Sequence, residues 1–137
     1  MEREIYTPPG GPPQDPINPN LFKNLGEEKI RSLANFFYKE IALSAIRPMY
    51  PEDLKPGEEK LADFLIQVMG GPAYYSRKYG HPRMRARHFP FEIDEKARRV
   101  WLSCFKKALD AIDVNENDKV DIYSFLTSFS AWMVNKA

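Results

Sequence analysis

The amino-acid sequence predicts an all-α protein. Apolar residues recur at every third or fourth position in four long segments, which is the spacing of one helix face. After Leu21, no alternation of apolar and polar residues is long enough to predict a strand, and glycine or proline separates several of the segments. The chain has 137 residues, of which 43% are hydrophobic, and is long enough to bury its own core. We therefore expect one helical domain.

Residues 1–20 differ from the rest of the chain. They contain six of the twelve prolines together with Gly10 and Gly11. Proline lacks the amide proton that regular structure needs, so this stretch cannot carry a helical hydrogen-bond ladder. We expect residues 1–20 to form an extended, flexible N-terminal extension and residues 21–137 to form the folded domain.

Two long helices are predicted in the first half of the domain. The first covers residues 28–45 and ends before Pro48 and Pro51, because a proline disfavours helix in the residue before it. The second begins near Pro56, a residue favoured in the first turn, and ends at Gly70-Gly71-Pro72. Their buried faces are expected to contain Ile30, Leu33, Ala34, Phe37, Ile41 and Ala45, and then Leu61, Phe64, Leu65, Val68 and Met69.

Two more long helices are predicted after an irregular connection. Residues 72–93 are expected to be irregular, with one short helix around residues 84–88. Asp94 is a favourable N-cap, so the third long helix begins directly after it. A polar turn over residues 113–119 then leads into the last helix. Their buried faces are expected to contain Ala97, Val100, Trp101, Cys104, Phe105, Ala108 and Ile112, and then Ile122, Phe125, Leu126, Phe129 and Met133.

Composition restricts the classes of function. The net charge is only +1, which argues against general binding of polyanions. A single cysteine, Cys104, excludes an internal disulfide framework and fits a reducing compartment. No apolar run approaches the ~20 residues that cross a bilayer, and the first residues lack the apolar core of a signal peptide. We expect a cytoplasmic protein that binds no membrane.

The most informative residue is His88, which ends an arginine-rich run. It is followed at once by the apolar turn Phe89-Pro90-Phe91, and residues 77–99 around it carry a local charge of +5. A neutral imidazole is a common transition-metal ligand, and nearby arginines would neutralise an anionic group. The residues alone also allow a histidine that merely caps a short helix, or a basic segment that binds nucleic-acid phosphates.

Further motifs favour the first of these interpretations. They are Phe37-Tyr38, Tyr50-Pro51-Glu52-Asp53, Leu61 with Phe64-Leu65, Gly70-Gly71-Pro72, the basic run at residues 80–88 and Trp101-Leu102-Ser103-Cys104. In this order and spacing, the chain resembles the truncated haemoglobins of the second group. The resemblance covers residues 21–135, and its most specific parts are residues 70–91 and the tryptophan. It implies a shortened globin fold, a two-over-two helical sandwich around haem b (iron protoporphyrin IX).

The resemblance also implies which residues contact the haem. His88 matches the proximal iron ligand, and Arg85, one helical turn earlier, matches the family's usual partner of a haem propionate. Tyr75, His81 and Arg83 are candidate helpers on the propionates. The remaining cofactor contacts implied are Phe64, Leu61, Phe91 and Trp101.

On the distal side, the family's polar residues match Tyr38, Tyr50 and Trp101. Leu61 and Phe64 match the apolar distal wall, and Gly57 falls where other globins often carry a distal histidine. The loop after Asp53 is one residue shorter than the family pattern, which loosens the alignment at Gly57. Because glycine has no side chain, we expect an open entrance to the distal pocket at position 57.

Such a site has a chemical consequence. A bound diatomic ligand acquires negative charge, and tyrosine hydroxyls and an indole N–H can donate hydrogen bonds to it. Each such bond is worth ~1.5–3 kcal/mol, so two would slow oxygen release by roughly two to four orders of magnitude. We therefore expect tight binding of oxygen, carbon monoxide or nitric oxide, suited to ligand redox chemistry or detoxification and not to bulk transport.

Several activities remain compatible with this interpretation. Nitric oxide dioxygenation and weak peroxidase activity both fit, and either requires an unidentified reductase. An alternative is a haem-based sensor or electron-transfer adaptor that docks a partner through the proline-rich residues 1–20. A cofactor-free nucleic-acid binder is disfavoured because so many aromatic residues face inward, so we expect no nucleic-acid partner. We expect a monomer or a weak homodimer.

Overall fold

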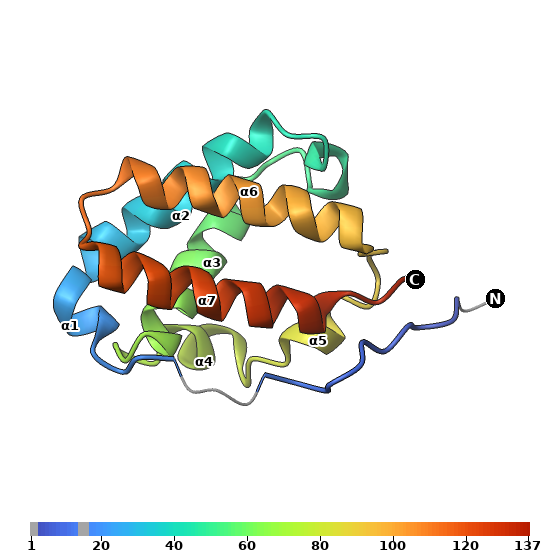
Figure 1. The fold of residues 1–137 in the computed structure, drawn as a ribbon, viewed down its shortest axis with the longest axis horizontal. Helices are drawn as coiled ribbons and strands as arrows, with labels where there is room; N and C mark the ends of the chain where they lie inside the picture. Colours follow the sequence, from blue (N-terminus) through green and yellow to red (C-terminus); the bar gives the residue numbers. More distant parts are fainter. Residues whose placement is uncertain (1–2, 14–16) are drawn as a thin grey trace.

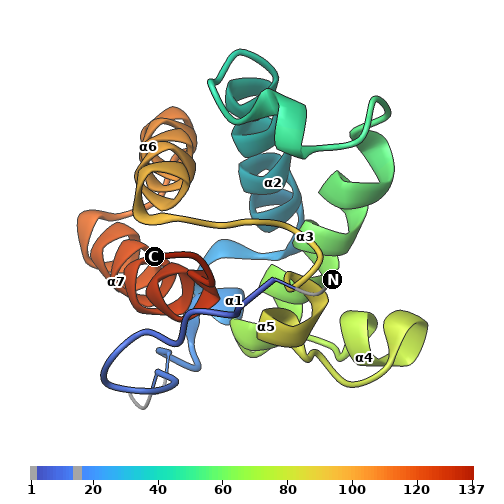
Figure 2. The same cartoon turned by 90° about the vertical axis from the view of Figure 1, so that its right-hand side faces the viewer.

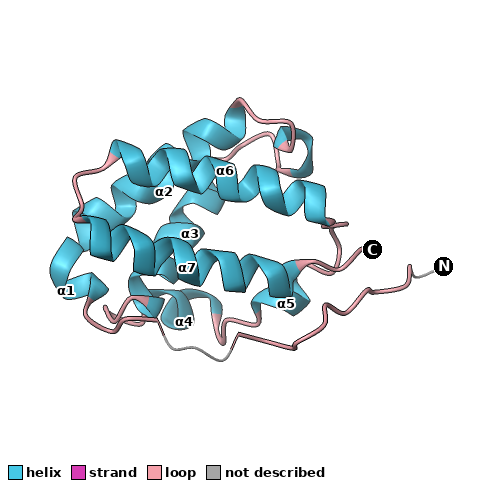
Figure 3. Ribbon diagram, viewed as in Figure 1, coloured by secondary structure: helices cyan, strands magenta, loops and turns pink. Residues whose placement is uncertain are grey.

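The computed structural model describes residues 3–13 and 17–137. Its helices are α1 (Leu21–Leu25), α2 (Glu27–Ala42), the 3₁₀ turn η1 (Arg47–Met49), α3 (Lys55–Val68), α4 (Tyr74–Tyr79), α5 (Met84–Arg87), α6 (Glu95–Ala111) and α7 (Glu116–Met133) (Figure 1). No strand occurs in these described ranges (Figure 3). The predicted all-α fold is confirmed.

The four long helices form two packed pairs. Helix α2 packs against both α3 and α6, and α6 packs in turn against α7, as the end-on view in Figure 2 shows. Phe37 of α2 and Phe105 of α6 are almost fully buried, and their rings stack at a centroid distance of 3.9 Å. The hydrophobic core therefore lies between the pairs. Within the described residues, no helix is long and apolar enough to cross a membrane.

The helix ends follow from local hydrogen bonds. Asp94 accepts a hydrogen bond at 2.8 Å from the amide of Ala97, so the predicted N-cap is confirmed. Asn115 caps α7 in the same way, by accepting from the amide of Asp118 at 2.8 Å. Because of this cap, α7 begins at Glu116, inside the segment predicted as a polar turn.

Helix α4 lies in the connection that the sequence predicts to be irregular outside residues 84–88. Two contacts stabilise this short helix. The Tyr75 side chain is buried in the core, and the Gln67 side chain accepts a hydrogen bond from the Ser76 amide at 2.9 Å and donates one to its hydroxyl at 2.8 Å. Both contacts come from outside the helix, so local periodicity does not reveal it.

The described part of the N-terminal extension contains neither helix nor strand. Its residues lie against the domain at two places. Near Pro19, Gly70 has a φ of +100°, and a Cβ there would lie 2.3 Å from the Pro19 carbonyl oxygen, so only glycine fits. Near the other end, the amide of Tyr6 donates to the carbonyl of Asn135 at 3.0 Å. Residues 14–16 of the extension lie outside the described residues.

Candidate functional site

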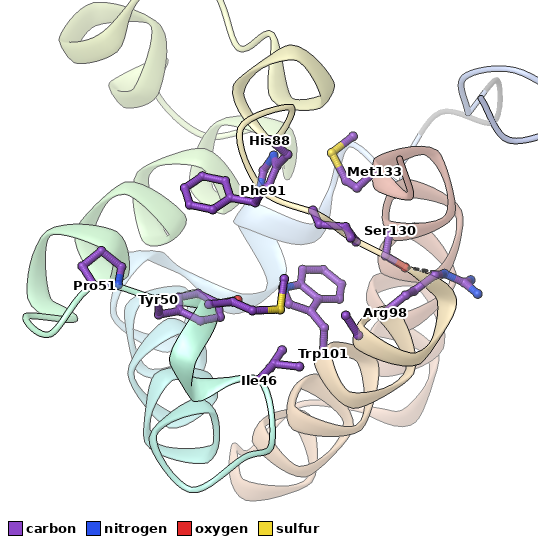
Figure 4. A pocket seen from close by; sticks show the side chains of 12 residues that line it. Ile46, Tyr50, Pro51, His88, Phe91, Arg98, Trp101, Ser130 and Met133 are labelled. Atoms are coloured by element: carbon purple, nitrogen blue, oxygen red, sulfur yellow. Dashed lines mark hydrogen bonds between the residues drawn. The ribbon is translucent and has the colours of Figure 1, made fainter. Parts of the chain in front are cut away.

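A largely apolar cavity of about 170 Å³ lies between η1, α6, α7 and the loop that follows α5. Figure 4 shows His88 and Phe91 on one side of it and Tyr50 and Trp101 on the opposite side. Met133 of α7 completes its wall. The structure thus brings together four of the residues that the sequence predicts for the site.

The side chain of His88 is held in one orientation by its own helix. Its Nδ1 lies 2.6 Å from the carbonyl oxygen of Met84, four residues earlier. A carbonyl can only accept, so Nδ1 carries the proton and donates. The Nε2 lone pair is then available to a metal ion, and a backbone carbonyl bonded to the other ring nitrogen is the usual arrangement for a ligating histidine.

The opposite wall carries hydrogen-bond donors. Tyr50 and Trp101 line the cavity, and the ring of Tyr38 packs edge-on against that of Tyr50 with centroids 5.8 Å apart. Burial raises the pKa of Tyr38 to about 12. Burial likewise raises the pKa of Tyr50, and the Tyr38 group beside it adds to the rise. Both hydroxyls therefore stay protonated at neutral pH and can donate.

These pKa shifts predict a pH dependence. The pKa of the Tyr38 hydroxyl is higher in the folded protein than its ordinary value of 10.0. The contribution of this group to stability is therefore complete below pH 10. As pH rises through the folded value of about 12, that stabilisation is lost. We expect the free energy of unfolding to fall above about pH 10. Urea unfolding between about pH 7 and 11 checks it, and a free energy of unfolding that stays constant across this range would contradict it.

Gly57 does not open an entrance, and here the structure differs from the sequence-based expectation. Gly57 lies in the first turn of α3, and a Cβ built there would lie 2.7 Å from the hydroxyl oxygen of Tyr38. The space above the glycine is therefore filled by Tyr38, whose side chain lies behind Tyr50 and not on the cavity wall. The absence of a side chain at position 57 makes room for the Tyr38 hydroxyl.

This contact predicts energetic coupling between the two positions. Alanine at an exposed helical position normally stabilises by about 0.5–1 kcal/mol relative to glycine. In Gly57→Ala, the new methyl group displaces the Tyr38 hydroxyl, so we expect no stabilisation or a loss of about 1 kcal/mol. In a Tyr38→Phe background the clash is relieved and the gain should return. A double-mutant cycle of urea unfolding measures the coupling, and additive effects would contradict the contact.

The other apolar candidates lie behind the cavity wall. Phe64 is buried, with its ring edge-on to Tyr75 at 5.8 Å and tilted against Phe129 at 5.4 Å. Phe129 in turn approaches Trp101 at 6.5 Å. Leu61 is half-buried against the same core. These residues support the wall that Trp101 presents.

The basic candidates do not line the cavity. The Arg85 guanidinium donates to the carbonyls of Trp132, of Val134 at 2.9 Å and of Tyr6 at 2.8 Å, and it lies 4.5 Å from the centroid of a Trp132 ring. These hydrogen bonds turn the Arg85 guanidinium toward the segments near the two ends of the chain and away from the cavity. His81 and Arg83 are exposed on the connection between α4 and α5.

The sequence did not single out Arg98, which does line the cavity. Its guanidinium donates to two groups of α7, the Ser130 hydroxyl at 3.0 Å and the Thr127 carbonyl at 2.9 Å. It also donates to the carboxylate of Glu95 on its own helix at 2.8 Å. Its position one turn before Trp101 on α6 is the only sequence signal for this placement.

Comparison with known proteins identifies the family of this chain. The family model of the bacterial-like globins matches residues 20–135. The group 2 truncated hemoglobin YjbI of Bacillus subtilis is 34% identical over 116 residues, which are 84% of this chain and 88% of that protein. This chain belongs to the group 2 truncated haemoglobins.

Solved structures of haemoglobins share its architecture. The truncated oxygen-avid haemoglobin from Bacillus subtilis superposes on this globin with a TM-score of 0.81 and 34% identity, over 84% of this chain and 98% of that one. The thermostable hemoglobin from the actinobacterium Thermobifida fusca gives a TM-score of 0.81 and 39% identity, over 84% and 96%. The predicted two-over-two globin fold is confirmed, and this globin is a haem protein.

The residues around the cavity fit a haem group. His88 has its Nδ1 occupied by the Met84 carbonyl and its Nε2 available, the surrounding walls are mainly apolar, and Tyr50 and Trp101 lie on the facing side. An imidazole nitrogen on one side of an apolar space and polar groups across it are what a haem group that binds a small ligand would need. His88, Phe91, Tyr50 and Trp101 are therefore the residues that would contact the haem or its ligand.

Proposed function

We propose that this globin holds haem b through Nε2 of His88, binds oxygen and other small diatomic ligands tightly and serves redox chemistry on the ligand in preference to bulk transport. One observation carries the proposal. The orientation of His88, which its Met84 hydrogen bond fixes, directs the residue into a cavity whose opposite wall presents Tyr50 and Trp101. The oxygen-avid character named for the relative from Bacillus subtilis supports it.

The chain's own residues have distinct roles in this proposal. When bound, the haem iron supplies the coordination position for the ligand. Tyr50 and Trp101 donate hydrogen bonds to that ligand and retard its escape. Tyr38 acts behind Tyr50 by packing on its ring and keeping its hydroxyl in place.

Other residues would interact with the carboxylates of the haem. His81 and Arg83 are exposed and accessible to haem carboxylates. Arg85 would not contact the haem itself. Its guanidinium donates to the Val134 carbonyl and so holds the segment after α7 against α5. A separate, unidentified reductase would return the iron to its ferrous state.

The proposal predicts a specific loss in His88→Ala. We expect the unsubstituted protein to take up one haem per chain and to give distinct visible spectra in its ferrous, oxygen-bound and carbonmonoxy forms. His88→Ala should lose the sharp Soret band or bind haem weakly, because the imidazole that would hold the iron is gone. His81→Ala removes the only other histidine and is the matched control: loss of one exposed contact to a haem carboxylate should leave the Soret band in place. Equal spectra for the two variants would contradict the assignment of His88.

A further inference from the structure

The side chain of Asn135 is fully buried just after α7, and both its polar atoms are paired. Its Nδ2 donates to the carbonyls of His88 at 3.1 Å and Phe91 at 3.0 Å. Its Oδ1 accepts from the amide of Ile93 at 2.9 Å. One amide group therefore holds three points of residues 88–93, which we call the proximal loop.

Arg3 of the N-terminal extension closes the same network. Its Nη2 donates to Asn135 Oδ1 at 3.0 Å and to the carbonyls of Phe89 and Phe91, each at 2.8 Å. Its Nη1 donates to the Asn135 carbonyl at 3.0 Å. Figures 1 and 2 show the N-terminal stretch, the end of the chain after α7 and the connection from α5 to α6 gathered at one end of the molecule. We call Arg3 and Asn135 together the clasp.

The position of the proximal loop decides where three cavity residues lie. His88, Phe91 and Ile93 all line the cavity, yet residues 88–93 form no regular ladder that would fix their backbone. Without the clasp, the carbonyls of His88 and Phe91 would lose the Asn135 amide as donor. A fully satisfied buried amide is a rigid support, because breaking any of its bonds leaves a polar group desolvated.

We propose that Asn135 and Arg3 are positioning residues that fix the proximal loop and, through it, the imidazole of His88. The inference rests on the proposed role of His88 as the iron ligand. Outer groups that orient a metal ligand typically change metal affinity by about 10- to 100-fold when removed. Arg3 of the extension thus supports the haem site, although it lies more than eighty positions from His88 in the sequence.

Two matched pairs of variants test the clasp in the full-length protein. Asn135→Ala removes the buried amide, and Asn117→Ala removes an exposed one on α7. Arg3→Ala removes the surface part of the clasp without creating a cavity in the core, and Arg77→Ala removes an exposed arginine on α4. Arg3→Ala keeps the test decisive if Asn135→Ala folds poorly.

Three readouts separate positioning from mere stability. They are hydrogen exchange of the Ile93 amide in the haem-free protein, the rate of haem transfer to a scavenging apoprotein, and the iron–histidine stretching frequency in the ferrous protein. We expect exchange and haem loss to accelerate about tenfold in Arg3→Ala, more in Asn135→Ala, and the stretching band to shift or broaden in both. The two control variants should match the unsubstituted protein.

The outcomes that overturn the inference are distinct. Wild-type haem loss and an unchanged stretching frequency in both clasp variants would overturn the clasp alone, whatever their melting temperatures. Failure of the unsubstituted protein to take up haem would overturn the proposed function, and with it the role of the clasp toward the iron.

Discussion

Replacing Tyr50 with phenylalanine is expected to raise the oxygen dissociation rate about 10- to 100-fold, because a hydrogen bond to a charged partner is worth about 1.5–3 kcal/mol. Tyr50 lines the cavity opposite His88, and its raised pKa keeps the hydroxyl protonated as a donor. The ring itself is retained in the variant, so its packing against Tyr38 should survive. The effect therefore reports the hydroxyl.

Two further variants assign this effect. Tyr38→Phe should have a smaller effect, since the Tyr38 hydroxyl lies against Gly57 and not on the cavity wall. Tyr123→Phe removes the hydroxyl of a half-buried tyrosine on α7 and should leave the rate unchanged. Stopped-flow displacement of oxygen by carbon monoxide measures all three rates. A larger effect in Tyr38→Phe than in Tyr50→Phe would assign the contact to the other tyrosine.

Replacing Phe105 with alanine should lower the free energy of unfolding by about 3–5 kcal/mol. Phe105 is fully buried, stacks on Phe37 at 3.9 Å and lies edge-on to Trp101 at 4.6 Å. Truncation leaves a cavity between the two helix pairs and removes the support on which Trp101 rests. We therefore expect faster oxygen release as well as lower stability.

Urea unfolding of the haem-free and haem-bound forms measures the loss at Phe105. Phe36→Ala is the matched control on α2, because Phe36 is only partly buried and should cost much less. A loss below about 1 kcal/mol in Phe105→Ala would show that the site collapses around the missing ring and that the aromatic stack does not support the fold.

The long helices were predictable because burial imposes a periodic pattern. Apolar residues at every third or fourth position marked α2, α3, α6 and α7, and Asp94 marked the start of α6 through the chemistry of its side chain. Helix α4 has only six residues, too few for a period to emerge. It is held by contacts with distant residues, which a local pattern does not contain.

Four residues of the candidate site were predictable because they belong to the motifs that carry the family resemblance. His88, Phe91, Tyr50 and Trp101 all line the cavity that the structure shows. Arg98 and Asn135 were not predicted, because their roles depend on which way a side chain turns after folding.

At Arg85 and Gly57 the sequence predicted a role, and the structure differs from the prediction. Arg85 shares a face with His88 in sequence spacing, but the carbonyls after α7 and that of Tyr6 attract its guanidinium. The missing side chain at Gly57 led us to expect open space there, but the Tyr38 side chain of α2 fills that space. In both cases a partner distant in sequence decides the outcome.

The contacts of Arg3 bear on the alternative that residues 1–20 dock a partner. Since Arg3 bonds to the proximal loop, we expect deletion of residues 1–20 to speed haem loss, besides any effect on a partner.

The most direct test of the central claim is a proton NMR spectrum of the ferrous, ligand-free haem protein carrying His81→Gln, so that His88 is the only histidine. Nδ1 of His88 lies 2.6 Å from the Met84 carbonyl oxygen, which can only accept, so Nδ1 donates and Nε2 would be the nitrogen that holds the iron. The account predicts one exchangeable N–H signal shifted far outside the diamagnetic range by the iron, absent when His88 is also replaced. No such shifted signal in a protein that has bound its haem would contradict ligation by His88.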